Sequence, residues 1–477
     1  MRRIAPSVAR VAWTFALVSG LTLAASGSAG ARTAPTESGP RIVRQVVNVS
    51  KMSGNQAEIA VAVNPTNPDN VVIASNLETG SGLFKAYSMN GGRTWTKTVI
   101  GDGDNLGNIC CDPTMSFDEF GNLFLAYLSD DDFGVVPVAL STDGGMTFDL
   151  LEEVGASSGA TGASAVRGAP ALGFVDQPTI VAAEGSVWVV FNSGSMEAAG
   201  APVNGPGQVG GFSNPQTAPG TSGCTFGDIA IGPNGQVMQT CQTGSGNGPG
   251  TIYVNVDPDG LGGAGFGARV TVSSTNVGQF DYIPAQSGRS VDAEAGLAWD
   301  RTGGPRNGRV YLIYADEFPQ ESHDHDIFLR TSDDNGATWS AAKRVNNDNT
   351  TNSQFLPRIA LDQTSGDIAV SFHDSRDDRG DGGAGDTNGV PNDDANFYIT
   401  FSANGGVSFA RNVRVSRGTS NDDQANNGVD YGDYTGLDFY AGNAHPGWAD
   451  NSNSTGDNPD GTLNEFDVYS AKVRARA

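Results

Sequence analysis

The stretch Ser88–Trp95 reads SMNGGRTW, and the same eight-residue pattern returns at Ser141–Phe148 (STDGGMTF), Ser332–Trp339 (SDDNGATW) and Ser402–Phe409 (SANGGVSF). Its consensus is S-x-D/N-x-G-x-T/S followed by an aromatic residue. The Asp or Asn side chain can accept hydrogen bonds from backbone N–H groups of its own turn, and the glycine can adopt a positive φ. The aromatic ring can pack beneath the hairpin. Four copies in one chain predict a structural unit that repeats along the sequence.

Short apolar segments surround each copy. Asp112–Asp118 and Gly121–Tyr127 are typical of two strands joined by a turn, and Arg358–Asp362 with Asp367–His373 repeats this arrangement. The 65 glycines and 23 prolines of the 477-residue chain also favour many short strands joined by turns. We therefore predict seven units, at residues 56–101, 110–155, 175–215, 222–274, 289–346, 354–416 and 428–474. The third, fourth and seventh lack a recognisable copy of the turn.

The eight-residue turn resembles the Asp box of the sialidase-like propellers, also called the bacterial neuraminidase repeat. At the level of the repeat, this resemblance covers nearly all of the chain after its N-terminal segment. It implies a β-propeller in which the Asp of each box has a structural role and no catalytic one. Because Asp boxes also occur in binding propellers and in other glycosidases, the resemblance implies architecture more firmly than activity.

The predicted fold is all-β, a single propeller of four-stranded blades, with seven blades and six as the alternative. The last unit ends at Glu465–Val473 without an outermost strand, whereas Ile42–Ser50 matches outer strands such as Arg411–Ser416. This N-terminal strand is expected to complete the last blade and close the ring, which removes two exposed sheet edges.

The first 31 residues have the pattern of a signal peptide, with a retained N-terminal anchor as the alternative. Arg2, Arg3 and Arg10 form a basic start, Val11–Ala25 is mostly apolar, and residues 29–31 (AGA) fit a cleavage site. The expected organisation is a signal peptide at 1–31, an N-terminal segment with the closing strand at 32–55, and the propeller at 56–477. The protein is therefore expected to be secreted, either extracellular or at the cell surface.

The charge of the chain excludes two classes of partner. The formal net charge is −25, and removing the three arginines of the signal segment changes it to −28. Nucleic acids and anionic membrane surfaces both require clusters of Lys and Arg, so neither is an expected partner. A monomer that acts on a glycan or glycoconjugate is expected instead.

Export permits disulfides among the four cysteines that remain. Cys224 and Cys241 flank a predicted hairpin and are expected to pair across it. Cys110 and Cys111 are adjacent, which leaves either a vicinal disulfide or two free thiols.

Aligning the first strand of each unit on its last residue places polar side chains at the mouth of the central channel. Six residues before the last position the alignment gives Glu58, Asp112, Gln177 and Glu294. Two residues further along the same face it gives Thr114, Thr179, Asp228, Arg358 and Tyr434. Carboxylates, an arginine and a tyrosine are therefore predicted to converge at one mouth.

The resemblance suggests roles for these residues. Sialidases use a tyrosine nucleophile, which in that family a Glu activates while an Asp acts as acid/base and three arginines bind the substrate carboxylate. By position, Tyr434 with Glu294 is similar to the Tyr/Glu pair, and Asp112 to the acid. The substrate-binding candidates are Arg358, Arg376, Asp228 and Glu58. The chain departs from the family because the Phe/Tyr-Arg-Ile-Pro motif that supplies the first arginine is absent.

Each nominated residue also has a structural interpretation. Asp112 precedes Pro113 and can shape the start of a strand, Arg358 can pair with a channel acid, and Tyr434 can fill the channel. Glu294 is the strongest functional candidate, because a carboxylate on an inner strand is costly unless it is used or paired.

Two loops have candidate metal ligands. No cofactor is expected to be required, but the acidic, glycine-rich loop 374–396 suits Ca²⁺, with Asp377, Asp381 and Asp386 as ligands; a solvated acidic loop is the alternative. His323 and His325 suggest a transition metal, but no third, distant ligand is evident from the sequence.

Three functions remain open. The first is a secreted glycosidase of sialidase-like type that hydrolyses a terminal sugar at the channel mouth. The second is a non-catalytic propeller that binds glycans or proteins there, and the third is another hydrolase or lyase on the same scaffold, because a fold does not determine its chemistry.

Overall fold

The computed structural model describes residues 41–78, 81–155, 174–244, 246–426 and 429–475, which form strands and turns. The predicted signal peptide lies outside the described residues. Among the residues that are described, no helix is long and apolar enough to cross a bilayer. The strands form seven antiparallel blades of four strands each, as the sequence predicts.

Blades 1 to 4 follow one another along the chain, each running from its inner to its outer strand. Blade 1 comprises β2 (Ala60–Val63), β3 (Val71–Asn76), β4 (Leu83–Ser88) and β5 (Thr96–Ile100). Blade 2 comprises β7 (Gly107–Phe117), β8 (Leu123–Ser129), β9 (Val135–Ser141) and β10 (Asp149–Gly155), with the short β6 (Asp102–Asp104) beside β7. Blade 3 comprises β11 (Asp176–Ala183), β12 (Ser186–Asn192), β13 (Met196–Pro202) and β14 (Gln216–Thr217). Blade 4 comprises β15 (Ile229–Ile231), β16 (Val237–Gly244), β17 (Gly250–Asp257) and β18 (Val270–Thr275).

An extra hairpin, which the repeat pattern does not predict, precedes blade 5 and consists of β19 (Asp281–Ile283) and β20 (Gln286–Val291). Blade 5 comprises β21 (Gly296–Trp299), β22 (Val310–Glu317), β23 (His325–Ser332) and β24 (Lys343–Arg344). Blade 6 comprises β25 (Gln354–Leu361), β26 (Ile368–Asp374), β27 (Asp394–Ser402) and β28 (Val413–Arg414), and β29 (Ser420–Asn421) also pairs with β27. Blade 7 comprises β30 (Gly436–Tyr440), β31 (Asn443–Asp450), β32 (Asp467–Arg474) and β1 (Arg41–Asn48).

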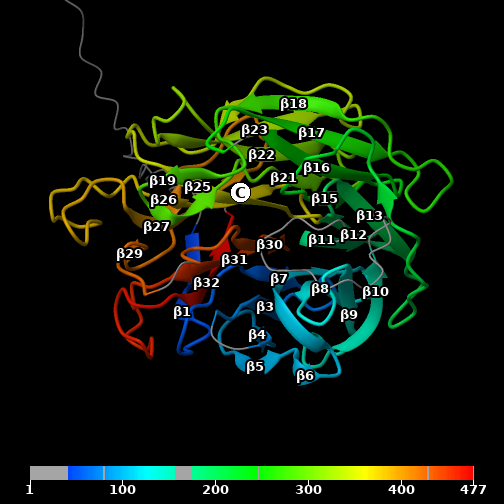
Figure 1. Ribbon diagram of the computed structural model, residues 1–477, viewed down its shortest axis with the longest axis horizontal. Helices are drawn as coiled ribbons and strands as arrows, with labels where there is room; N and C mark the ends of the chain where they lie inside the picture. Colours follow the sequence, from blue (N-terminus) through cyan, green and yellow to red (C-terminus); the bar gives the residue numbers. More distant parts are fainter. Residues whose placement is uncertain (1–40, 79–80, 156–173, 245, 427–428, 476–477) are drawn as a thin grey trace, which may run out of the picture. The chain divides into compact units, whose positions relative to one another are not determined.

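The ring closes in the way the sequence predicts. Strand β1 pairs antiparallel with β32, with Val47 opposite Ser470 and Asn48 opposite Tyr469, so the N-terminal strand is the outer strand of the last blade. The inner strands contact one another in the order β2, β7, β11, β15, β21, β25 and β30, and β30 contacts β2 again. Figure 1 shows this arrangement, with the blue β1 beside the red β32.

The hydrophobic core is divided among the blade interfaces. Blades pack face to face, so their middle strands are apolar on both sides; all seven residues of β8 and all nine of β27 are buried. The described residues form seven buried clusters, one between each pair of neighbouring blades. Burial of these faces is the main driving force that holds the ring together.

The eight-residue turns join the third and fourth strands of blades 1, 2, 5 and 6 and show the predicted hydrogen bonds. In blade 5, Asp334 Oδ1 accepts the Thr338 backbone N–H (2.8 Å), and Asp334 Oδ2 accepts the Thr338 hydroxyl (2.6 Å). Gly336 has a φ of 82°, and the Trp339 indole N–H donates to its carbonyl (3.1 Å). These turns lie at the end of the blades opposite the starts of the inner strands.

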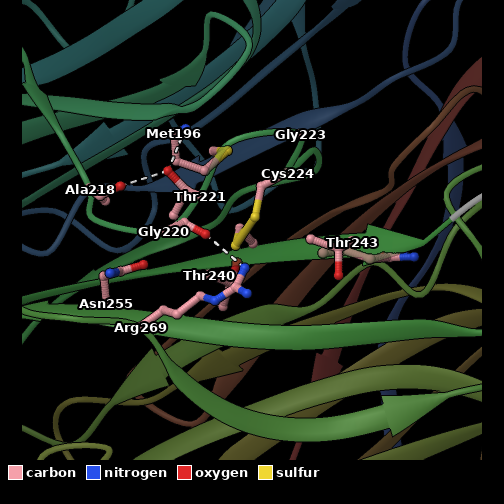
Figure 2. The surroundings of a disulfide bond; sticks show 12 residues. Met196, Ala218, Gly220, Thr221, Gly223, Cys224, Thr240, Thr243, Asn255 and Arg269 are labelled. Carbon is pink, nitrogen blue, oxygen red and sulfur yellow. Dashed lines mark hydrogen bonds between the residues drawn. A yellow bond between two sulfur atoms is a disulfide. The ribbon is translucent and has the colours of Figure 1, made fainter.

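Both pairs of cysteines form disulfides. Cys224 bonds to Cys241, which confirms the predicted pairing, and Cys110 bonds to Cys111. Figure 2 shows the first bond joining the segment before β15 to β16, with Arg269 reaching across to the Gly220 carbonyl (2.7 Å). Two disulfides are consistent with folding in an oxidising compartment.

Candidate active site

A repeated backbone feature marks the start of every inner strand. The residue six positions before the end of the strand alignment has a positive φ, between 43° and 82°, in all seven blades: Glu58, Asp112, Gln177, Phe226, Glu294, Leu356 and Gly432. Positive φ is uncommon outside glycine. The same positions disturb the strand pairing in blades 2, 3 and 6, which identifies them as bulges. Because this backbone conformation recurs in all seven blades, it is a property of the scaffold. Only the side chains at these positions can distinguish a functional site from the scaffold.

The starts of the inner strands surround a central channel. The channel encloses a cavity of about 620 Å³, a size that suits a small-molecule site. At the mouth, its lining is polar and mostly acidic and includes Gln177, Asp228, Asp292, Glu294, Arg358, Asp433 and Tyr434. The sequence alignment predicts five of these seven residues, and Asp292 and Asp433 are additions from the structure.

Glu294 lies in this channel in an environment that disfavours its charged form. Its exposed fraction is 8%, and neither of its carboxyl oxygens has a hydrogen-bond partner among the described residues. Burial raises the pKa of Glu294 well above its usual value, the neighbouring Asp292 raises it further, and Arg358 opposes both effects. Both oxygens of Glu294 are therefore available to a ligand, and the site favours the protonated form.

Asp433 lies in the same cavity but is held in an ion pair with an arginine. Arg289 Nε donates to Asp433 Oδ1 and Arg289 Nη2 to Asp433 Oδ2, both at 2.7 Å, in a bidentate ion pair. Arg289 also donates to Glu58 Oε1 (2.8 Å). Arg289 belongs to β20, so an element outside the repeat supplies this cation to the mouth.

Glu58 and Asp112 lie behind Arg289, in a side cavity of about 250 Å³ that Cys110 and Cys111 also line. Burial and the charge of Asp433 raise the pKa of Glu58 to about 7, although Arg289 opposes them. Burial raises the pKa of Asp112 well above its usual value, and Glu58 adds to the effect. The two carboxyl groups are hydrogen-bonded to each other, so the protonation of one depends on that of the other. The predicted acid Asp112 therefore lines the side cavity and not the main channel.

Tyr434 does line the channel, but its hydroxyl group is already engaged. It donates its single hydrogen to the Pro113 carbonyl (3.2 Å), so the structure does not bring it into the predicted hydrogen bond with Glu294. Burial raises the pKa of Tyr434 well above its usual value, and the charges of Asp112 and Glu58 raise it further. The neutral phenol is thus strongly favoured over the phenolate.

Of the predicted substrate-binding residues, Arg358 lines the channel beside Glu294. Asp228 also lines it, but its Oδ2 accepts the Leu297 backbone N–H (2.7 Å) and ties blade 4 to blade 5. Arg376 lies in blade 6, donates to Asp374 (2.7 Å) and stacks on the Tyr398 ring (4.5 Å). Its guanidinium group is held by the protein itself.

The predicted calcium ligands do not face one another. Asp377 accepts the Tyr398 hydroxyl (2.8 Å), Asp381 accepts the Gly383 N–H (2.9 Å), and Asp386 accepts the Gly382 N–H (2.7 Å). In the same loop, three other carboxyl groups have oxygens within 4.8 Å of one another, those of Asp378, Asp393 and Asp394. A cation in this loop would thus find its ligands in this second set.

Two residues of the site, Asp433 and Arg289, are not predicted from the sequence, and they differ in how easily they could have been found. Asp433 directly precedes Tyr434, so a shift of one residue in the strand alignment would have selected it. Arg289 has no comparable signal, because the β19–β20 hairpin does not belong to the four-stranded repeat.

Comparison with known proteins supplies no family. No protein-family model matches the sequence, and no curated protein matches it either. The sialidase-like assignment is therefore not confirmed.

Similar solved structures include a protein of unknown function from Dyadobacter fermentans, with 11% identity over 92% of this chain and 100% of that one, at a TM-score of 0.48. An α-L-arabinanase of Penicillium chrysogenum complexed with arabinobiose has 13% identity over 91% and 98% of the two chains, at 0.42. A lectin from Burkholderia pseudomallei has 11% identity over 76% and 84%, at 0.47.

Proposed function

We propose that the channel mouth is the active site of a secreted glycoside hydrolase that acts on a neutral sugar. The observation that carries this proposal is the presence, in one cavity, of a carboxyl group whose pKa is raised by burial and a second carboxyl group that is held in a bidentate ion pair with an arginine. Glu294 is the first and Asp433 the second. Two carboxyl groups in different environments are the usual acid and base of glycoside hydrolysis.

The proposed roles follow from this arrangement. Glu294 donates its proton to the leaving oxygen of the glycosidic bond, and Asp433 acts as the carboxylate partner on the other side of the sugar, where water replaces the leaving group. Arg289 holds Asp433 in place through the bidentate ion pair and also donates to Glu58. In this proposal, Tyr434 forms part of the wall of the sugar site and not the nucleophile, because its hydroxyl hydrogen is engaged by Pro113.

The charge at the mouth favours a neutral sugar. Asp228, Asp292, Glu294 and Asp433 line the channel there, and Glu58 and Asp112 line the side cavity behind it. Asp176 is a further carboxyl group close to Asp433. The cations beside them are Arg289 and Arg358, and Arg289 is already paired. An anionic sugar would meet unfavourable electrostatic potential at this site and along the approach to a chain of net charge −25.

A second function, non-catalytic glycan binding, is favoured by one specific contact. The bidentate grip of Arg289 on Asp433 occupies both oxygens that a reaction would require. If this ion pair persists when a sugar is bound, the mouth binds a glycan without cleaving it.

The test is a panel of chromogenic glycosides of neutral pentoses and hexoses, with a sialoside as the anionic comparison. Wild-type protein is expected to cleave at least one neutral glycoside, and Glu294→Gln to lower kcat by about 100- to 10,000-fold. Tyr434→Phe keeps the ring but loses the hydroxyl group, and it is expected to retain most of the activity. Saturable sugar binding without cleavage of any glycoside would establish the binding protein, and loss of activity in Tyr434→Phe alone would restore the tyrosine nucleophile.

A further inference from the structure

Three buried side chains with metal-binding atoms meet at the edge of blade 5. Asp281 comes from β19, Glu317 ends β22 and His325 begins β23. Their exposed fractions are 1%, 2% and 0%, and their ligand atoms all lie within 4.8 Å of one another. His325 Nε2 is 3.8 Å from Asp281 Oδ2 and 3.9 Å from Glu317 Oε2. Asp281 is thus the distant ligand that the sequence around His325 does not reveal.

The spacing fits a shared ion better than direct hydrogen bonds. Distances of 3.8 and 3.9 Å exceed hydrogen-bond length. Two ligand atoms at about 2.0–2.1 Å from a tetrahedral zinc ion lie roughly 3.4 Å apart, so a contraction of a few tenths of an ångström would complete the coordination. Three protein ligands leave one position for a water molecule.

The hydrogen bonds around the cluster leave the ligand atoms of two of its three residues unsatisfied. Neither ring nitrogen of His325 nor Asp281 Oδ2 has a hydrogen-bond partner among the described residues. The two carboxyl groups are held in place by other contacts. Asp281 Oδ1 accepts the Tyr282 N–H (2.8 Å), and Glu317 Oε2, the oxygen that faces His325, accepts the His323 N–H (2.9 Å). Buried polar atoms are rarely left without a partner, and fixed outer contacts are typical of metal ligands.

The charges of the cluster also call for a cation. The cluster combines two buried carboxyl groups with one imidazole ring. Among the described residues, neither carboxylate has a lysine or arginine within ion-pair distance; His325 is the basic group beside both.

We propose that Asp281, Glu317 and His325 bind a divalent transition-metal ion, with zinc as the best fit, and that this ion anchors the β19–β20 hairpin to blade 5. One imidazole nitrogen with two carboxylate oxygens is a donor set that zinc accepts.

The anchored hairpin reaches across the mouth. Gln286 Nε2 donates to the Gly432 carbonyl (3.1 Å), and Arg289 binds Glu58 and Asp433. The ion therefore has a structural role, which is to position the hairpin that delivers Arg289. This role holds whether the mouth cleaves a sugar or only binds one.

The experiment measures zinc binding to the whole protein after treatment with a chelator and dialysis. Wild-type protein is expected to take up one zinc ion per chain at this site, and its Tm is expected to rise by several degrees on zinc addition. Asp281→Asn is expected to weaken zinc binding at least 100-fold. Asp326→Asn is the matched control, because Asp326 follows His325 in β23 but pairs with Arg344 (2.6 Å), and it should bind zinc as wild type does.

Hydrogen exchange supplies the second readout. Removing zinc is expected to speed exchange of residues 281–291 while leaving β8 unchanged. Zinc uptake below about a tenth of an ion per chain, or tight binding that survives Asp281→Asn, would overturn the proposal. Binding that is lost in Asp393→Asn but not in Asp281→Asn would also overturn it and would place the ion in the loop of blade 6. Because Asp281 lies on a hairpin outside the blades, this test does not depend on whether a variant of the core residue His325 folds.

Discussion

The two ends of the blades use the same carboxyl groups in opposite ways. At the turn end, Asp334 is exposed and its oxygens accept hydrogen bonds. The hydrogen bond from the Thr338 side chain, followed by that from the Thr338 backbone, lowers the pKa of Asp334. At the mouth end, burial raises the pKa of Asp112 and Glu294, and the oxygens of Glu294 have no partners among the described residues. The turn end stabilises the hairpins of the four blades that have the turn, and it also links neighbouring blades, since Lys85 of blade 1 donates to the Gly145 carbonyl in the turn of blade 2 (2.8 Å). The mouth end gathers carboxyl groups from several blades at a cost in stability, which is typical of a functional site.

The strongest test of this contrast removes one carboxylate from each end. Asp433→Asn is expected to lower kcat on the cleaved glycoside by about 100- to 10,000-fold, because the amide cannot act as the anionic partner of Glu294. Asp334→Asn at the turn end is expected to leave kcat unchanged. Steady-state kinetics of both variants, with far-ultraviolet circular dichroism to confirm folding, measure the difference.

Equal losses of activity in the two variants would contradict a functional division between the ends. Unchanged kcat in Asp433→Asn would exclude this residue from catalysis and leave Glu294 without its proposed partner.

The two disulfides allow a comparison within the mouth end itself. Cys224 and Cys241 are separated by 17 residues, and a loop of this size corresponds to about 3 kcal/mol of stabilisation in the loop-entropy description. Cys110–Cys111 encloses almost no chain, so the same description gives it a small effect. Chemical denaturation of the two double Cys→Ser variants is expected to show a loss of about 3 kcal/mol for the first pair and less than about 1 kcal/mol for the second. Equal losses would show that the vicinal bond stabilises the fold by other means.

The raised pKa values predict how stability depends on pH. Burial raises the pKa of Glu58 to about 7 and that of Asp176 to about 6. In the range between the unfolded and folded pKa values, the folded state binds more protons than the unfolded state, so stability falls as pH rises. The Tm is expected to be higher at pH 5 than at pH 8. The free energy of unfolding is expected to fall over the same range, and Glu58→Gln is expected to reduce that fall by an amount on the order of 2 kcal/mol. A Tm that rises from pH 5 to pH 8 would contradict the buried state of these carboxyl groups.

The repeat made the fold predictable from the sequence. Each turn satisfies its own backbone within eight residues, so its chemistry is visible in a local pattern, and the missing outer strand of the last unit pointed to the N-terminal strand as its partner. Alignment on the ends of the inner strands then placed Glu294, Arg358 and Tyr434 at the mouth.

The remaining features depend on long-range contacts that no local pattern records. Arg289 reaches Asp433 across 144 residues of sequence, from a hairpin that forms its own two-stranded sheet outside the blades. The side chain of Tyr434 lies where the alignment predicts it, but its partner is a backbone carbonyl of blade 2, which residue types alone could not indicate.

The smallest expected effect on stability comes from an Asp→Asn exchange in an eight-residue turn, because both residue types already occur at this position in the protein. Two of the four turns have an Asn, Asn90 or Asn404, at the position that Asp143 and Asp334 occupy in the other two. The acceptor geometry is the same: Asn404 Oδ1 accepts the Ser408 N–H (2.9 Å), and Asp334 Oδ1 accepts the Thr338 N–H (2.8 Å). Asp334→Asn is therefore expected to change the free energy of unfolding by no more than a few tenths of a kcal/mol. Asp334→Ala leaves the turn N–H groups without their acceptor and is expected to cost about 1 kcal/mol. Urea denaturation of both variants measures the difference; a large loss in Asp334→Asn would show that the charge, and not the geometry of the acceptor, holds the turn.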